Sequence, residues 1–109
     1  MERFVRGDII VLSFPFTDLS ATKKRPALVL RKLAGLDYLL CQITTNSFAH
    51  SEEISLNPKD FIQGRLKKDS FIRFTKLFTA EESIIHYRAG KVSHQKIQEV
   101  VNSIHKFIS

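Results

Sequence analysis

The first two thirds of the chain alternate polar residues with β-branched and aromatic residues, or carry short apolar runs, a pattern typical of β-strands. The first predicted strand covers residues 7–14 and ends before Pro15, because proline cannot donate a hydrogen bond within a ladder. The polar residues 17–24 follow, and we expect them to form a mobile loop. Two further strands, residues 25–32 and 38–44, are separated by a turn and predict an antiparallel hairpin.

Three more short strands are predicted at residues 52–56, 70–73 and 83–88. Many short strands at close spacing are typical of a small barrel or a curled sheet. The pattern therefore predicts a mainly β fold, a β-barrel with helical additions.

The last segment of the chain has the spacing of an α-helix. Ser93 is a good N-cap, and Val92 and Ile97 occupy the two positions of a hydrophobic staple. One apolar stripe follows at helical spacing, made of Ile97, Val100, Val101, Ile104 and Ile108. We expect this C-terminal helix to close one side of the sheet.

The predicted hairpin brings an arginine and a threonine together. With a two-residue turn at positions 34 and 35, the cross-strand pairs are Arg25 with Thr44, Leu28 with Cys41 and Leu30 with Leu39. Arg25 and Thr44 then lie side by side at the open end of the hairpin. A register slip of one residue would turn one partner to the opposite face.

This pair suits phosphate chemistry. The arginine fork matches phosphate oxygens and keeps its charge at neutral pH, and threonine offers a hydroxyl. Charge and polar reach are added nearby by Lys23, Lys24, Thr45 and Asn46. The alternative is an ordinary solvated strand end with no chemical role.

Composition narrows the possible partners. The 109 residues are expected to form a single domain, residues 1–109, and the formal net charge of +6 favours a polyanion, nucleic acid first. The longest apolar runs have four residues, too few for a membrane span, so we expect no membrane association. The single cysteine, Cys41, and the lack of a secretory core near the first residue favour a cytoplasmic location.

Familiar catalytic motifs are missing from the sequence. It contains no GxSxG, HExxH or P-loop pattern, and its carboxylates and histidines are scattered rather than clustered. We therefore expect neither a metal site nor a cofactor.

Several segments together resemble the MazF/PemK/Kid family of toxins from prokaryotic toxin–antitoxin pairs. The resemblance lies in residues 7–18 (GDIIVLSFPFTD), 24–30 (KRPALVL), 41–45 (CQITT), 66–79 (LKKDSFIRFTKLFT) and 89–93 (AGKVS). It covers nearly the whole chain, and the combination of an Arg-Pro pair with a strand ending in threonine is its most specific part.

The resemblance implies a small SH3-like barrel of the CcdB–PemK type with a C-terminal α-helix, forming a homodimer. It implies a growth-arresting, sequence-selective endoribonuclease that cleaves single-stranded RNA without metal. The ribose 2′-hydroxyl would attack the adjacent phosphate and leave a 2′,3′-cyclic phosphate and a 5′-hydroxyl. It also implies an acidic antitoxin as partner and DNA binding together with that antitoxin.

The family's catalytic residues fall on Arg25 and Thr44 in this sequence. The loop between the first two strands borders the RNA groove in the family, so we expect RNA contacts from that region and from the strand end and the late strand. The expected RNA-binding residues are Phe16, Thr17, Lys23, Lys24, Thr45, Asn46, Arg73 and Lys76.

One departure from the Kid-like pattern concerns the late strand. Kid-like members carry an arginine and, two residues later, an aspartate with acid–base roles; here Arg73 is followed by Thr75. Deprotonating an arginine at pH 7 costs about 7 kcal/mol, so we expect Arg25 to stabilise charge on the phosphorane. No residue is assigned as general base.

Two alternatives use the same barrel without catalysis. A gyrase poison of the CcdB kind relies on a C-terminal tryptophan, and this sequence has no tryptophan. A plain nucleic-acid-binding barrel would use the same cations, including Lys67 and Lys68, to contact phosphates.

Overall fold

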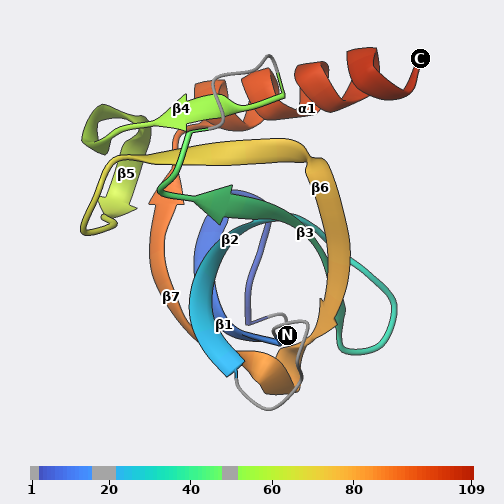
Figure 1. The fold of residues 1–109 in the computed structure, drawn as a ribbon. Coiled ribbons are helices and arrows are strands. Elements are labelled where there is room, and N and C mark those ends of the chain that lie inside the picture. Colours follow the sequence, from blue (N-terminus) through green and yellow to red (C-terminus); the bar gives the residue numbers. More distant parts are fainter. Residues whose placement is uncertain (1–2, 16–21, 48–51) are drawn as a thin grey trace.

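The computed structural model describes residues 3–15, 22–47 and 52–109. One antiparallel sheet contains seven strands in the order β4-β6-β3-β2-β1-β7-β5. The strands are β1 (Asp8–Pro15), β2 (Thr22–Lys32), β3 (Asp37–Thr44), β4 (Ile54–Leu56), β5 (Phe61–Gly64), β6 (Ser70–Glu81) and β7 (Ile85–Val92). Two short 3-10 helices, η1 (Pro58–Asp60) and η2 (Glu82–Ile84), and the helix α1 (His94–Ile108) complete the described chain. The sheet curls into a half-barrel with α1 across one side, which confirms the mainly β prediction (Figure 1).

The loop predicted between the first two strands is shorter in the structure. Residues 22–24 belong to β2 and pair with residues 13–15 of β1, so their assignment to a mobile loop was wrong. Pro15 is the last residue of β1, where its missing N–H costs the ladder little. The rest of the predicted loop, residues 17–21, lies outside the described residues.

The second half of the sheet differs more from the prediction. β6 continues to Glu81, well past the predicted end at residue 73, and turns a corner on the way (Figure 1). The predicted strand at residues 83–88 begins later, because residues 82–84 form η2. β5, which pairs with β7, has no counterpart in the prediction.

The register of the β2–β3 hairpin follows the predicted pairing as far as Val29. Leu28 pairs with Cys41 as expected, but a bulge follows, and Arg31 instead of Leu30 lies opposite Leu39. The extra residue shifts the ladder only on the turn side of the bulge. The last ladder pair toward the candidate site, Ala27 with Gln42, keeps the predicted register.

Two apolar clusters lie on the two faces of β2. The α1 side contains Ile9, Leu28, Leu30, Cys41, Ile43, Ile54, Leu56, Ile72, Phe74, Val92, Ile97 and Val100. The opposite cluster contains Phe4, Ile10, Leu12, Ala27, Val29, Tyr38, Leu40, Ala80 and Ile85. Consecutive residues of β2 alternate between these clusters, as the pleat requires.

The start of α1 matches the predicted cap. The Ser93 side chain accepts a hydrogen bond of 3.1 Å from the Lys96 amide, and Val92 and Ile97 are both buried. Ile108, the last residue of the predicted apolar stripe, is 70% exposed, so the stripe is not buried along its whole length. The last turn of α1 lies at the edge of the molecule, where the sheet no longer covers it (Figure 1).

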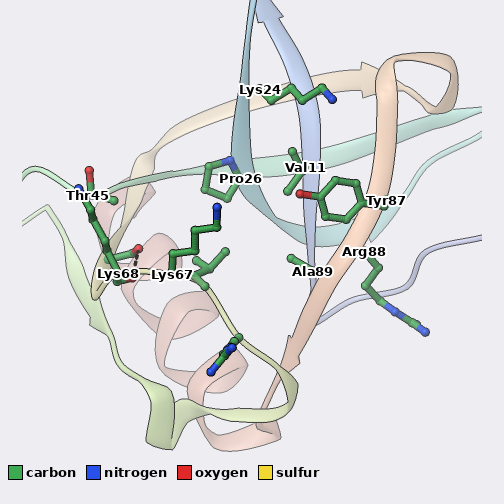
Figure 2. Close-up of a pocket in the computed structure, with 12 residues that line it drawn as sticks. Val11, Lys24, Pro26, Thr45, Lys67, Lys68, Tyr87, Arg88 and Ala89 are labelled. Atoms are coloured by element: carbon green, nitrogen blue, oxygen red, sulfur yellow. Dashed lines mark hydrogen bonds between the residues drawn. The ribbon is translucent and has the colours of Figure 1, made fainter.

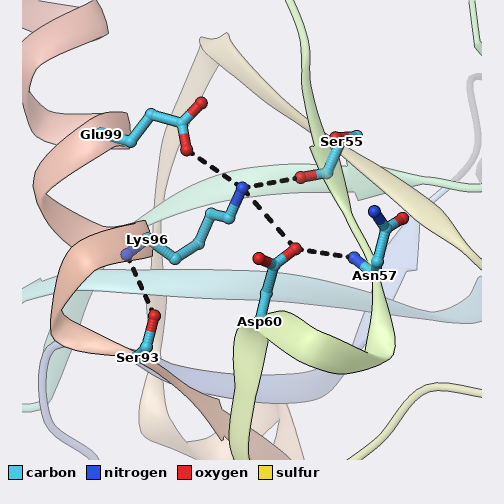
Figure 3. A network of polar contacts seen from close by, with 6 residues as sticks. All are labelled: Ser55, Asn57, Asp60, Ser93, Lys96 and Glu99. Carbon is cyan, nitrogen blue, oxygen red and sulfur yellow. Dashed lines mark hydrogen bonds and ion pairs between the residues drawn. The ribbon is translucent and has the colours of Figure 1, made fainter.

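A buried lysine ties α1 to the segment between β4 and β5 (Figure 3). The Lys96 ammonium lies 3.1 Å from the Ser55 carbonyl oxygen, 3.0 Å from a Glu99 carboxylate oxygen and 3.6 Å from an Asp60 carboxylate oxygen. Asp60 in turn accepts a hydrogen bond of 2.8 Å from the Asn57 amide. This Lys96 network supplies partners to a charge that would otherwise be costly to bury.

Candidate active site

Arg25 and Thr44 lie near the ends of β2 and β3. The ladder pairs closest to these ends are Leu28 with Cys41 and Ala27 with Gln42. The same register, extended two residues beyond the ladder, would place Arg25 opposite Thr44. Cβ atoms of directly opposed residues in an antiparallel pair lie about 5 Å apart.

Both side chains belong to the face of the sheet opposite α1. Arg25 is separated by two and four residues from Ala27 and Val29, which pack in the cluster on that face, so its side chain points to the same face. Thr44 shares that face with Leu40 for the same reason. Arg25 and Thr44 are each only partly buried. A group approaching from solvent can therefore reach the guanidinium and the hydroxyl at the rim of the apolar cluster.

The Thr44 hydroxyl is oriented by the backbone that follows β3. Its oxygen accepts a hydrogen bond of 3.2 Å from the amide of Asn46. A hydroxyl that accepts from an amide keeps its own proton available to donate. This arrangement suits donation from Thr44 to an anionic oxygen.

β6 brings a second arginine to the same face. Arg73 pairs with Gln42, two residues before Thr44 on β3, and its neighbours Ile72 and Phe74 pack in the cluster under α1. By alternation, the Arg73 side chain lies on the face of Arg25 and Thr44. The site face therefore carries two guanidinium groups.

The corner of β6 follows Arg73. Cys41 pairs with Leu77 and Gln42 with Arg73, so residues 74–76 have no ladder partner on β3. In this corner the Thr75 hydroxyl donates a hydrogen bond of 3.2 Å to a carboxylate oxygen of Glu52, and Lys76 is exposed. A carboxylate of Glu52 thus stands beside the position where Kid-like members carry their aspartate.

The other expected RNA-binding residues are divided between two faces. Lys23 is exposed and pairs with Phe14, whereas Lys24 and Thr45 line a cavity on the α1 side of the sheet. Asn46 is exposed and contacts Thr44 through its backbone. Phe16 and Thr17 lie outside the described residues.

The cavity that contains Lys24 and Thr45 has a volume of about 660 Å³. Its wall includes two residues that the sequence analysis did not single out, Arg65 and Tyr87. The one available signal was an aromatic residue within the predicted strand at residues 83–88, which by itself does not indicate a cavity. Tyr87 is 52% exposed.

Cys41 lies beneath the site and takes no part in its surface. Its thiol donates a hydrogen bond of 3.3 Å to the Arg73 carbonyl oxygen, and burial raises the pKa of the thiol to about 12. Burial disfavours the thiolate, so Cys41 is a packed, uncharged group at neutral pH.

Within residues 3–15, 22–47 and 52–109, no group of three or more histidine, cysteine, aspartate or glutamate side chains is arranged to hold a metal ion. In the same part of the chain, no helix has the length and apolar character needed to cross a bilayer.

Comparison with solved structures shows which proteins share this fold. The crystal structure of MazE–MazF (form III) from Deinococcus radiodurans superposes with a TM-score of 0.77 at 16% sequence identity, over 96% of this chain and 95% of the other. An endoribonuclease in complex with its cognate antitoxin from a mycobacterial species gives 0.76 at 11% identity, over 96% and 94%. The Mycobacterium tuberculosis toxin MazF-mt6 gives 0.71 at 17% identity, over 93% and 95%. No curated protein matches the chain.

The sequence itself matches a family model over nearly its whole length. Residues 5–108 match the model of the PemK-like, MazF-like toxins of type II toxin–antitoxin systems. The half-barrel with its C-terminal helix agrees with this match. The chain belongs to the PemK-like, MazF-like toxin family of type II toxin–antitoxin systems.

Proposed function

We propose that the chain is an endoribonuclease toxin that cleaves single-stranded RNA without a metal ion. The ribose 2′-hydroxyl gives up its proton as its oxygen attacks the adjacent phosphorus, the bond from phosphorus to the 5′-oxygen breaks, and that oxygen takes up a proton, so that no net proton is released. The products carry a 2′,3′-cyclic phosphate and a 5′-hydroxyl. The observation that carries the proposal is that Arg25, Thr44 and Arg73 share one partly exposed face at the ends of neighbouring strands.

Each of these groups has a role that follows from its chemistry. The Arg25 guanidinium binds the non-bridging oxygens, whose negative charge grows in the phosphorane. The Thr44 hydroxyl donates a hydrogen bond to the same oxygens, since its own oxygen already accepts one from the Asn46 amide. Arg73 adds positive charge that attracts the phosphates of the RNA and holds the RNA strand in place.

The test is cleavage of a long single-stranded RNA in the presence of EDTA. We expect cleavage by the unmodified chain and a rate loss of about 10²–10³ for Arg25→Ala, the size typical of losing one donor to a developing anion. Thr44→Val should also slow cleavage, by about 10². Arg31→Ala is the matched control, because Arg31 is an exposed arginine at the other end of β2.

Product chemistry gives an independent test. An oligonucleotide with a single 2′-deoxyribose at the mapped cut position should stay intact, because it lacks the nucleophile. The downstream product should accept a 5′-phosphate from polynucleotide kinase without prior dephosphorylation. Cleavage that survives both Arg25→Ala and Thr44→Val would contradict the proposed site, and RNA binding without any product would favour the non-catalytic alternative.

The proposal includes two partners. The solved structures named above include a MazE–MazF complex and an endoribonuclease with its antitoxin, and we propose that an acidic antitoxin segment binds this chain of net charge +6. We also propose a homodimer through the end of α1. There Phe107 is 52% and Ile108 70% exposed, and the Phe107 ring meets Phe74 edge to face. Sedimentation equilibrium of Phe107→Asp should then show a lighter species than the unmodified chain.

A further inference from the structure

The cavity on the α1 side of the sheet lies directly behind the candidate active site. Lys24 and Thr45 line it, and each is the chain neighbour of a proposed catalytic residue, Arg25 and Thr44. Successive residues of a strand point to opposite faces, so the cavity and the active site open on the two sides of the same strand ends. An extended chain that passes over this edge meets both.

The cavity has an apolar floor and an aromatic wall. Val11, Pro26 and Ala89 line the floor, and the ring of Tyr87 extends across toward Val11 (Figure 2). Its volume of about 660 Å³ is within the range of small-molecule sites. A half-exposed tyrosine over an apolar floor is a suitable stacking partner for a planar base.

The rim of the cavity is positively charged. Five cationic residues line it, Lys24, Arg65, Lys67, Lys68 and Arg88, and no carboxylate of the described residues does so. The Lys67 ammonium points into the cavity toward Pro26 (Figure 2). The Arg88 guanidinium points away from the cavity (Figure 2) and lies 3.7 Å from the buried Asp8 carboxylate, so it contributes less to the cavity's charge than the other four.

Contacts at its two ends fix the segment that carries Lys67 and Lys68. The Ser70 hydroxyl, which is buried, donates a hydrogen bond of 3.0 Å to the Lys68 carbonyl oxygen at the start of β6. At the other side, Gly64 packs against β7 so closely that a Cβ atom would lie 2.1 Å from the Ala89 carbonyl oxygen. The segment that carries Lys67 and Lys68 is therefore anchored at both ends.

We propose that this cavity, the Tyr87 cavity, binds a nucleotide of single-stranded RNA that flanks the cleaved bond. The base stacks on Tyr87, and the adjoining phosphates contact Lys67 and Lys68. The inference rests on the proposed function, because it takes the RNA at Arg25 and Thr44 as the strand that continues into the cavity. Contacts outside the cleaved bond would let the chain prefer some flanking sequences through stacking strength.

The direct test is binding to an RNA that cannot be cut. The probe is a fluorescein-labelled, random-sequence 20-nucleotide single strand with every 2′-hydroxyl methylated, followed by fluorescence anisotropy. Tyr87→Ala should raise Kd about tenfold, and Tyr87→Phe should bind within about twofold of the unmodified chain, because phenylalanine keeps the stacking face. Lys106→Ala on the last turn of α1 is the charge control and should bind normally.

Salt dependence tests the phosphate contacts separately. Removing both lysines in Lys67→Ala/Lys68→Ala should reduce the slope of log Kd against log salt by about 1.4, since each phosphate contact to a single strand contributes about 0.7. Far-UV circular dichroism of every variant shows whether the fold is kept. Tyr87 and both lysines are exposed, so we expect these variants to fold.

The outcomes separate this inference from the proposed function. Normal RNA cleavage, with probe binding unchanged in Tyr87→Ala and in the lysine variant, overturns the inference and leaves the nuclease proposal standing. Weakened probe binding without cleavage by the unmodified chain supports an RNA subsite and contradicts the nuclease. If the variants bind the probe normally but lose affinity for a 20-residue peptide of glutamate and leucine, the cavity is a peptide site and the inference is wrong.

Discussion

The Lys96 network provides a quantitative test of what joins α1 to the sheet. Lys96→Met keeps the apolar stem of the side chain and removes the ammonium group, with its charge and its hydrogen bonds. The lysine side chain is 10% exposed and that of Asp60 13%, so the change leaves a carboxylate with little access to water. Asp60 keeps one hydrogen bond, from the Asn57 amide.

The magnitude follows from the three contacts of the ammonium. At 3.6 Å and an effective dielectric constant of about 20, the attraction between Lys96 and Asp60 is about 4–5 kcal/mol before desolvation is subtracted. The hydrogen bond to the Ser55 carbonyl oxygen adds about 1.5–3 kcal/mol, and the half-exposed Glu99 adds less than about 0.5 kcal/mol. Releasing the lysine from its own desolvation offsets roughly two thirds of this total, which leaves an expected loss of about 2–3 kcal/mol.

The assay is urea unfolding followed by far-UV circular dichroism at one fixed protein concentration. With a slope of about 2 kcal/mol per molar urea, Lys96→Met should lower the midpoint by about 1 M. The double variant Lys96→Met/Asp60→Asn removes the unpaired carboxylate and should recover about half of the loss. Glu99→Gln is the control and should shift stability by less than about 0.5 kcal/mol. A Lys96→Met midpoint equal to that of the unmodified chain, or a double variant no better than the single one, would refute the reasoning.

Three further predictions concern stability at individual positions. The Tyr38 hydroxyl is buried and has no hydrogen-bond partner among the described residues, so Tyr38→Phe should leave thermal stability unchanged or raise it by up to about 1 kcal/mol. If the variant instead lost more than about 1 kcal/mol of stability, the hydroxyl would have to be hydrogen-bonded. Burial raises the pKa of Cys41 to about 12 from an ordinary 9.0, so the folded state keeps the thiol proton at a pH where the unfolded state loses it, and the free energy of unfolding should fall as pH rises from 9 toward 12. A Cys41→Ala variant should show a shallower fall over this range. An identical slope of unfolding free energy against pH in the variant would contradict this reasoning. Gly35 and Gly64 both have positive φ, +68° and +66°, so each alanine variant should lose about 1 kcal/mol of stability. Only at Gly64 would the new Cβ atom lie 2.1 Å from a carbonyl oxygen, so Gly64→Ala should unfold at a clearly lower urea concentration than Gly35→Ala. Equal urea midpoints would show that β5 can move away from β7 at little cost.

The sequence predicted the parts of the fold that depend on local signals. The cap at Ser93, the staple of Val92 and Ile97, and the pairing of Leu28 with Cys41 all follow from periodicity and short-range chemistry. The same local register placed Arg25 and Thr44 at neighbouring strand ends, and the role of that pair in cleavage remains a prediction until the variants are measured.

Features that depend on contacts between distant segments could not be predicted from local sequence patterns. The bulge after Val29 and the full length of β6 are set by how the sheet curls, which no window of neighbouring residues encodes. β5 is a strand only because β7 lies beside it, and its pattern of one partly buried and three exposed residues gives no periodic signal. Tyr87 was missed for a similar reason, since its cavity is formed by β1, β2, β7 and the residues before β6.

The corner of β6 bears on how such a protein can diverge. Residues 74–76 make no ladder pairs with β3, whereas Arg73 before them and Leu77 after them are paired. A substitution at Thr75 or Lys76 therefore leaves the ladder pairs on either side intact, whereas Phe74 is fixed by its burial under α1. Mutation can explore new chemistry beside Arg73 without threatening the fold, so relatives with the same architecture are free to acquire different substrate preferences at this bend.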